Sequence, residues 1–131
     1  MSQSYIIGVQ FEPIGKQYYF DASRYPDLKP GDPVIVRTSR GLQLANINQV
    51  GINEENLDLH SFKPVERPAN PADLLNRKAL ALREEETENK IRDYFNENGL
   101  SAIKIVSVEY SLDGNQLFIL INSESSVNYN L

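Results

Sequence analysis

Short apolar segments separated by turn residues occupy the first fifty positions, and they predict a small β-sheet. Side chains along these segments alternate between apolar and polar or are β-branched, as strands favour. Glycine and proline between them favour tight turns. The segments cover residues 5–11, 16–20, 34–36 and 42–47. Four or five such strands with close turns predict two hairpins in a curved sheet or partial barrel over about residues 4 to 50.

One long helix is predicted over residues 71–98. Asn70 suits the cap position before a helix, Pro71 suits the first helical position, and Asp73 places an acid in the first turn. At the other end, Gly99 supplies a residue that readily adopts the left-handed conformation of a helix stop. At 1.5 Å per residue, such a helix is about 42 Å long, more than a domain of this size covers along its whole length.

Apolar residues gather at the two ends of the predicted helix, and its centre is polar. The ends carry Leu74, Leu75, Ala79 and Leu82, and then Ile91, Tyr94 and Phe95. The central stretch REEETENK, residues 83–90, has no large apolar residue, so we expect it to face water or a partner. A solvated face is the commoner reading of such a pattern, and a protein-binding surface is the alternative. That surface would use Arg83, Glu84, Glu86, Thr87 and Lys90.

A further hairpin is predicted near the end of the chain. Apolar residues alternate along residues 103–112, Asp113-Gly114 favours a tight turn, and residues 117–121 are apolar on both faces. We expect this last strand to be buried on both faces, with the helix packed on the hairpin. The predicted fold class is α+β, with an N-terminal β subdomain at residues 1–66 and the helix plus hairpin at residues 67–131.

The charge balance is acidic and uneven. The net charge is −5, and residues 1–68 hold seven Lys/Arg against eight Asp/Glu, whereas residues 69–131 hold six against ten. Binding to a phosphate backbone draws its free energy from lysine and arginine, so this balance argues against a dedicated nucleic-acid binder. A local basic patch remains compatible with it.

The absence of cysteine excludes disulfides, thiolate zinc sites and cysteine-ligated iron–sulfur clusters, and it fits a cytosolic protein. The first residues carry no basic leader, and their apolar run is broken by Gly8 and Gln10. They therefore predict neither a signal peptide nor a membrane span. We expect a cytoplasmic protein with no membrane attachment.

The stretch FEPIGKQYYFD, residues 11–21, combines aromatic and basic residues and allows two interpretations. In a strand, Tyr18 and Phe20 share one face, so beside Lys16 they could stack single-stranded bases. The commoner outcome is that these aromatics pack in the core and hairpin. Together with Lys16, Arg37 and Arg40 form the best candidate basic cluster for nucleic-acid binding. The alternative is that they are ordinary surface charges.

Candidate catalytic groups are sparse. His60 is the single histidine, so a zinc site would lack its usual partners, and no glycine-rich phosphate loop runs from a strand into a helix. Consecutive glutamates at 84–86 point around a helix and cannot converge on one site. The sequence predicts no metal site, no cofactor and no enzymatic activity.

A series of motifs resembles one family, the polymerase-suppressor or PSP-one C-terminal conserved region. The motifs are FEPIGKQYYFD, LKPGDPVIV, TSRGLQLA, KPVERPA, NGL and VSVEYSLDGNQLFI. They occur in one order and extend from about Tyr5 to Val127. Two features of the family are missing from the pattern: the helix that usually follows the final hairpin, and the cysteine-rich segment of bacterial relatives.

The resemblance implies a non-enzymatic regulatory adaptor that works through protein contacts in complexes linked to RNA processing or developmental regulation. The alternative is direct binding of RNA or single-stranded DNA through Lys16, Tyr18, Phe20, Arg37 and Arg40. Without the final helix, a sheet face carrying Phe118 and Leu120, or Leu117 and Ile119, should be less covered. An exposed apolar face of this kind favours a partner, and homodimerisation is one outcome.

Overall fold

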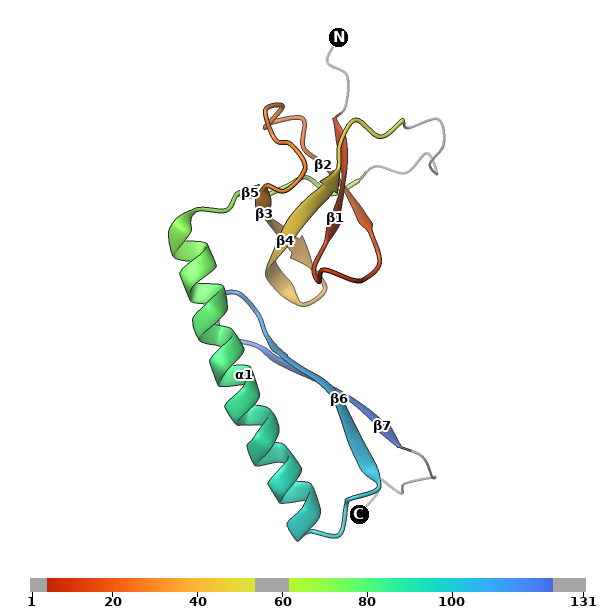
Figure 1. The fold of residues 1–131 in the computed structure, drawn as a ribbon, viewed down its shortest axis with the longest axis vertical. Helices are drawn as coiled ribbons and strands as arrows, with labels where there is room; N and C mark the ends of the chain where they lie inside the picture. The colour runs from red at the N-terminus through yellow and green to blue at the C-terminus, as the bar shows by residue number, and fades with distance from the viewer. Residues whose placement is uncertain (1–4, 54–61, 124–131) are drawn as a thin grey trace. The chain divides into compact units, whose positions relative to one another are not determined.

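The computed structural model describes residues 5–53 and 62–123. Contacts divide the chain into two compact units, Met1–Leu74 and Leu75–Leu131, whereas the sequence placed the boundary between residues 66 and 67. Helix α1 (Pro71–Glu97) begins in the first unit and continues into the second. The architecture is α+β, as predicted: a five-stranded sheet, one helix and a two-stranded hairpin (Figure 1).

The first unit contains an antiparallel sheet with the strand order β2-β1-β4-β3-β5. Its strands are β1 (Ile6–Gln10), β2 (Tyr18–Asp21), β3 (Pro33–Thr38), β4 (Gly41–Gln49) and β5 (Arg67–Pro68). Strands β1 and β2 form one predicted hairpin and β3 and β4 the other. The short strand β5 and the central pairing of β1 with β4 were not predicted.

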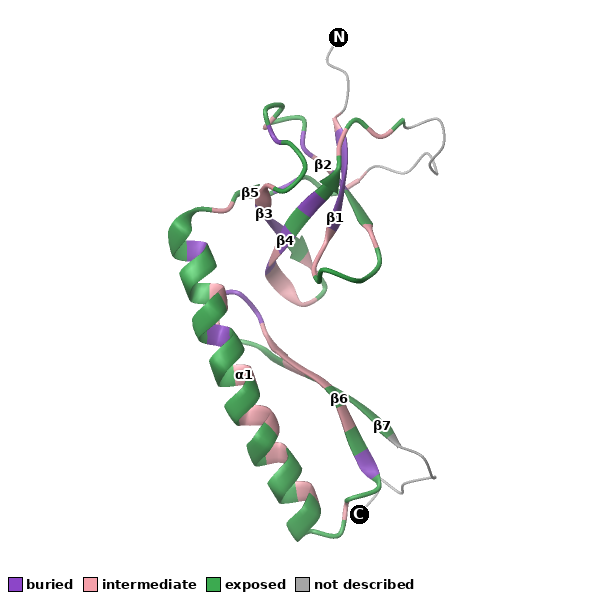
Figure 2. Cartoon of the chain, viewed as in Figure 1, coloured by how far each residue is buried: buried purple, intermediate pink, exposed green. Residues whose placement is uncertain are grey.

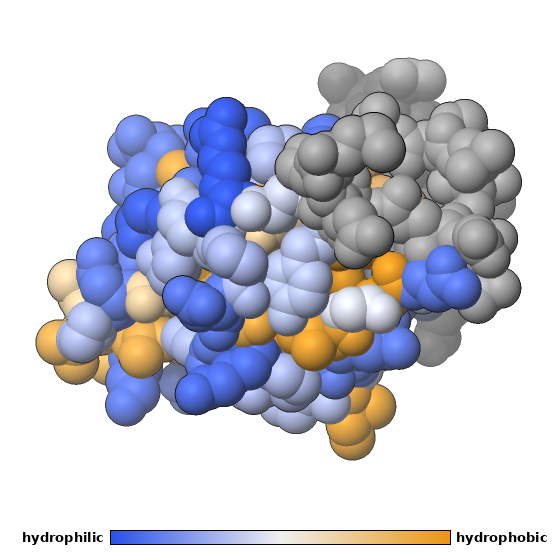
Figure 3. All heavy atoms as spheres, turned by 90° about the horizontal axis from the view of Figure 1, so that it is seen from above, coloured by the Kyte–Doolittle hydropathy of each residue, from blue (hydrophilic) through white to orange (hydrophobic). Residues whose placement is uncertain are grey.

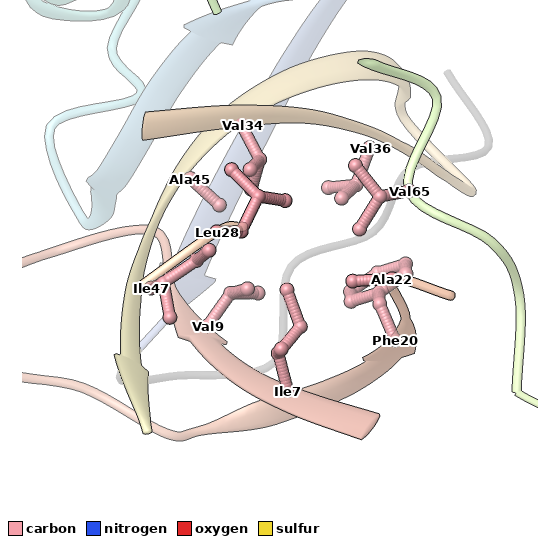
Figure 4. Packing of buried hydrophobic residues seen from close by; sticks show 10 residues of the cluster. All are labelled: Ile7, Val9, Phe20, Ala22, Leu28, Val34, Val36, Ala45, Ile47 and Val65. Atoms are coloured by element: carbon pink, nitrogen blue, oxygen red, sulfur yellow. The ribbon is translucent and has the colours of Figure 1, made fainter. Parts of the chain in front are cut away.

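The sheet curls around an apolar core made mostly of alanine, valine and isoleucine side chains. Figure 4 shows side chains of β1 and β2 pointing toward those of β3 and β4 across this interior. The ten buried residues are Ile7, Val9, Phe20, Ala22, Leu28, Val34, Val36, Ala45, Ile47 and Val65. Because only every second residue of a strand points inward, the curvature lets one sheet supply opposite sides of its own core.

Residues Lys63–Val65 bridge the gap between the two edges of the curved sheet. The Asp21 N–H donates to the Lys63 carbonyl at 2.9 Å, and the Val65 N–H donates to the Asp21 carbonyl at 2.8 Å. The next residue continues toward the opposite edge, since the Glu66 N–H donates to the Ile35 carbonyl at 2.9 Å. Val65 is buried, and this bridging segment makes the sheet a partial barrel.

Helix α1 starts and stops where the sequence predicted. Asn70 Oδ1 accepts the Asp73 N–H at 2.9 Å, and Asp73 Oδ2 accepts the Asn70 N–H at 2.8 Å, which is a reciprocal capping box. At the other end Gly99 has a φ of 71°, the left-handed conformation that ends a helix. At the N-terminal end, the capping box therefore satisfies backbone N–H groups that a helix end otherwise leaves unpaired.

The first turn of helix α1 is also bound to β5 by an ion pair. Arg67 donates from Nη1 and Nη2 to the two carboxylate oxygens of Asp73, at 2.5 and 2.9 Å. Asp73 is buried. The hydrogen bonds from Arg67, followed by the backbone hydrogen bond from Asn70, hold the pKa of Asp73 below its usual value, while burial opposes them.

We expect this carboxylate to contribute to acid sensitivity. Its folded pKa is lowered, so its stabilisation is full above the unfolded value near 3.9 and is lost as pH falls through the folded pKa. Asp73→Asn should therefore reduce the loss of unfolding free energy measured between neutral pH and about pH 3. Asn96→Ser, an exposed change on the same helix that removes no titratable group, should leave that loss as it is; equal effects of the two changes would contradict the assignment.

The second unit contains the hairpin of β6 (Ile103–Tyr110) and β7 (Leu117–Ser123). The predicted Asp113-Gly114 turn joins them, with Gly114 at a φ of 76°. A bulge between Ile105 and Ser107 interrupts β6. Helix α1 runs alongside this hairpin (Figure 1), and buried Leu80 and Leu112 lie where the two meet, since Asn76 Nδ2 donates to the Leu112 carbonyl at 2.7 Å.

The burial of β7 differs from the prediction. Both faces were expected to be covered, yet large apolar side chains of this strand are exposed, and Figure 2 shows most of β7 in green. They are Leu117, Ile119, Leu120 and Ile121. A two-stranded sheet with one helix beside it has too few neighbouring elements to cover both faces. Residues 124–131 lie outside the described residues.

Candidate functional site

The residues proposed for stacking bases are only partly accessible. Tyr18 is exposed on β2, its ring lies 5.5 Å from Lys16 Nζ, and it meets Phe11 edge to face at 5.5 Å between centroids. Tyr19 is also exposed and contacts Phe62, with 6.0 Å between ring centroids. Lys16 and Tyr18 thus form a small cationic and aromatic surface at the edge of the sheet.

Phe20 does not belong to that surface. It is buried in the core of the partial barrel, so its ring cannot stack on a base. Tyr18 and Phe20 share a face by strand alternation, but β2 is an edge strand and the curved core covers only its Phe20 end. The two-ring surface suggested by the sequence is corrected to the single ring of Tyr18.

The two arginines of the proposed basic cluster have different surroundings. Arg37 lies on β3 and its Nε donates to Glu66 Oε1 at 3.4 Å, so a carboxylate offsets its charge. Arg40 lies in the turn between β3 and β4, where its backbone N–H donates to Thr38 Oγ1 at 3.0 Å. The Thr38 contact holds the backbone of this turn.

The polar centre of helix α1 contacts the hairpin of its own unit. Glu84 Oε2 accepts the backbone N–H of Tyr110 at 2.7 Å, and Oε1 forms an ion pair with Arg77. Arg77 Nη1 in turn donates to the Tyr110 carbonyl at 3.4 Å. Glu84 and Arg77 thereby satisfy the backbone of β6 where a third strand would otherwise do so.

Tyr110 makes two further contacts with the same helix. The guanidinium of Arg83 lies 4.4 Å from the centre of the Tyr110 ring, and Thr87 Oγ1 lies 2.9 Å from the Tyr110 hydroxyl. Three of the five residues proposed for partner binding, Arg83, Glu84 and Thr87, therefore engage the hairpin. Glu86 and Lys90 are exposed. The expectation that the whole segment faces water or a partner is corrected accordingly.

Large apolar side chains are exposed on the opposite part of the helix surface. Leu75 is 67% exposed and Leu82 is 65% exposed. They lie seven residues apart, with exposed Ala79 between them, so all three share one side of the helix. The apolar stripe predicted from these residues exists, but it points outward, and Leu80 is the leucine that the helix buries.

The hairpin adds exposed apolar groups of its own, with Val106 on β6 and Ile119 and Leu120 on β7. Figure 3, seen from above the view of Figure 1, shows scattered orange hydrophobic groups among blue hydrophilic ones on that face. Single exposed apolar residues are ordinary, whereas several on neighbouring positions of one element mark an interaction surface. Helix α1 and strand β7 are the elements with this property.

Within residues 5–53 and 62–123, no three acidic or histidine side chains lie close enough together to hold a metal ion. His60 lies outside the described residues. Over the same ranges, no helix combines the length and apolar character needed to cross a membrane.

The fold and its exposed elements define an α+β domain that presents apolar helix and strand surfaces. Residues 63–130 match the family model described as the PSP1 C-terminal conserved region, and the chain belongs to this family. The match includes helix α1 and the β6–β7 hairpin. It confirms the PSP-one resemblance of the sequence motifs.

Among curated proteins, the chain is similar to the stage 0 sporulation protein YaaT of Bacillus subtilis (strain 168). The two are 30% identical over 132 residues, which cover 95% of this chain and 45% of the relative. The chain thus spans less than half the length of that protein. No solved structure gives a significant match.

Proposed function

We propose that this protein is a non-enzymatic regulatory adaptor that binds other proteins through the outward surface of helix α1. Membership of the PSP1 family and similarity to a protein named for sporulation support a regulatory role. The proposal includes a cytoplasmic location, which the absence of cysteine favours, and a link to RNA processing or developmental regulation.

The observation that carries the proposal is the exposed side of α1 formed by Leu75, Ala79 and Leu82. Positions i, i+4 and i+7 are the spacing with which a helix inserts apolar anchors into a groove on a partner. Burying two leucine side chains contributes roughly 1.5 to 3 kcal/mol each. The exposed Glu86 continues the same side one turn further on and supplies a charge at the rim of such a contact.

Affinity capture with the tagged chain, carried out with and without nuclease to remove nucleic acid, tests the proposal. Proteins captured by the tagged chain should remain after nuclease treatment and should be lost with Leu75→Ser/Leu82→Ser. The matched control is Lys78→Ser, an exposed change on the same helix, which should retain them. Capture that disappears with nuclease, or that persists fully in the double variant, would refute binding through this surface.

Direct binding of single-stranded nucleic acid is the second candidate, and the Lys16–Tyr18 contact favours it. One base stacked on an exposed tyrosine contributes roughly 1 to 3 kcal/mol. Glu66 beside Arg37 weakens this candidate, because a carboxylate repels phosphate.

An oligonucleotide titration separates the two candidates. If the second candidate holds, Tyr18→Ala should weaken binding by at least about fivefold, and affinity should fall steeply between about 50 and about 200 mM salt. Tyr94→Ala is the matched control, since Tyr94 is an exposed tyrosine on helix α1. No binding at low salt would exclude this candidate.

A further inference from the structure

The outward side of helix α1 changes character along its length. Its first half carries the exposed Leu75 and Leu82, which the proposed function uses as anchors. The same side then continues toward the end of the helix in steps of four and seven residues. It carries three exposed acids there, Glu86, Asp93 and Glu97. An apolar half of this side is therefore followed by an acidic half.

These acids have no internal partner within residues 5–53 and 62–123. Over those ranges, no hydrogen bond or ion pair joins their side chains to another residue. On other sides of the same helix, Arg77 pairs with Glu84, and Arg92 pairs with Glu88. The charge of the outward acidic half is thus not offset by the contacts that hold the helix on its own hairpin.

Asp93 and Glu97 also lie where negative charge destabilises a helix. The carbonyl end of a helix carries a partial negative charge that favours basic side chains, yet the last turn of α1 has none. The two acids are four residues apart on one side of the helix, so their like charges repel each other. Residues that oppose a local rule without a compensating contact in the fold are candidates for a role in function.

We propose that the protein bound by helix α1 has a groove that is apolar at one end and lined with lysine or arginine at the other. This inference rests on the proposed function and adds the chemistry and the direction of the contact. The leucines occupy the apolar end, and Asp93 and Glu97 meet the basic end. Charge complementarity disfavours other occupants, because these acids repel phosphate and a second copy of this chain also carries a net charge of −5.

Neutralising two of the acids tests the basic end of the groove. The probe is the most abundant nuclease-resistant protein captured by the tagged chain, purified and titrated against the full chain. Asp93→Asn/Glu97→Gln should raise the dissociation constant about two- to fivefold at about 50 mM salt, and the difference should shrink toward about 200 mM. The matched control, Glu12→Gln/Asp27→Asn, removes the same two charges from exposed positions of the first unit and should leave binding nearly unchanged.

Thermal unfolding of the free chain gives a second measurement that needs no partner. Asp93→Asn/Glu97→Gln should raise the midpoint by about 1 to 4 °C, since the change removes repulsion at the end of the helix. The control variant should not raise it. A purely structural role for the two acids predicts a lower midpoint together with weaker binding, and that combination would overturn the inference.

The leucine variant separates a failure of this inference from a failure of the proposed function. If Leu75→Ser/Leu82→Ser abolishes binding while Asp93→Asn/Glu97→Gln leaves it unchanged or tightens it, the groove is not basic and only this inference fails. Equal weakening by the control variant would also overturn it, because net charge rather than position would then matter. Undiminished binding of the leucine variant would refute the proposed function itself.

Discussion

Replacing Glu84 with alanine is expected to lower the free energy of unfolding by about 2 to 3 kcal/mol, because the change leaves two polar groups without their partner. Glu84 is mostly buried, accepts the Tyr110 N–H and forms an ion pair with Arg77. Removal of the Glu84 carboxylate leaves the Tyr110 N–H and the Arg77 guanidinium without this partner, and water reaches neither group fully. Urea unfolding followed by far-ultraviolet circular dichroism measures the effect on the unit that contains most of the helix.

The neighbouring glutamates supply the controls for this prediction. Glu85→Ala and Glu86→Ala should change the free energy of unfolding by no more than about 0.5 kcal/mol, since both side chains are exposed. Glu84→Gln keeps an acceptor for the Tyr110 N–H and should cost less than Glu84→Ala. Equal effects of alanine at all three positions would mean that Glu84 has no special role on the hairpin.

Replacing Ile7 with alanine should have the largest effect on the first unit, with a loss of about 2 to 5 kcal/mol in unfolding free energy. Ile7 is 0% exposed in the core of the partial barrel (Figure 4), and it pairs with Phe20 on β2. The lost apolar contact and the cavity left behind both contribute to this cost. Thermal or urea unfolding of the full chain measures it.

Ile14 provides a control of the same residue type. It is 91% exposed in the turn that joins β1 and β2, so Ile14→Ala removes no packed atoms and should change stability by less than about 0.5 kcal/mol. A large loss at Ile14, or a small one at Ile7, would contradict the placement of the core inside the curved sheet.

Much of the fold follows from local chemistry that the sequence displays. Turn residues located the hairpins, and the Asn70 cap and Gly99 stop located the ends of the helix to within one residue. Strand order and the short strand β5 could not be predicted, because they depend on contacts between distant residues. No local pattern distinguishes Arg67 as the partner of Asp73.

The orientation of helix α1 was less predictable for a physical reason. Its inward positions follow the usual spacing but hold mixed chemistry: Asp73, Arg77, Leu80, Glu84 and Thr87. The apolar residues with helical spacing are instead the exposed Leu75 and Leu82. Polar side chains of the helix make the hydrogen bonds to Tyr110 at the end of β6. Residues 73, 77, 80, 84 and 87 are spaced three or four apart, which places them on one side of a helix. This spacing was the feature of the sequence that could have indicated the inward side.

The prediction that strand β7 is buried on both faces was wrong, although its apolar pattern is clear. An apolar run on both faces is usually a buried central strand, but here the described part of the sheet has only two strands. Apolar pattern predicts the need for cover, and not whether the same chain supplies it. For the proposed base-stacking surface, the sequence grouped Lys16 with Tyr18, and the structure places Lys16 Nζ 5.5 Å from the Tyr18 ring centre. The burial of Phe20 follows from sheet curvature that no local pattern shows.

The affinity of a purified captured partner, measured across a salt series, tests the adaptor account most directly. We predict that the dissociation constant changes less than about threefold between about 50 and about 200 mM salt, and that Leu75→Ser/Leu82→Ser raises it at least about tenfold. A loss of about a thousandfold in affinity over that salt range, with the double variant unaffected, would show that phosphate contacts rather than the apolar side of helix α1 drive binding.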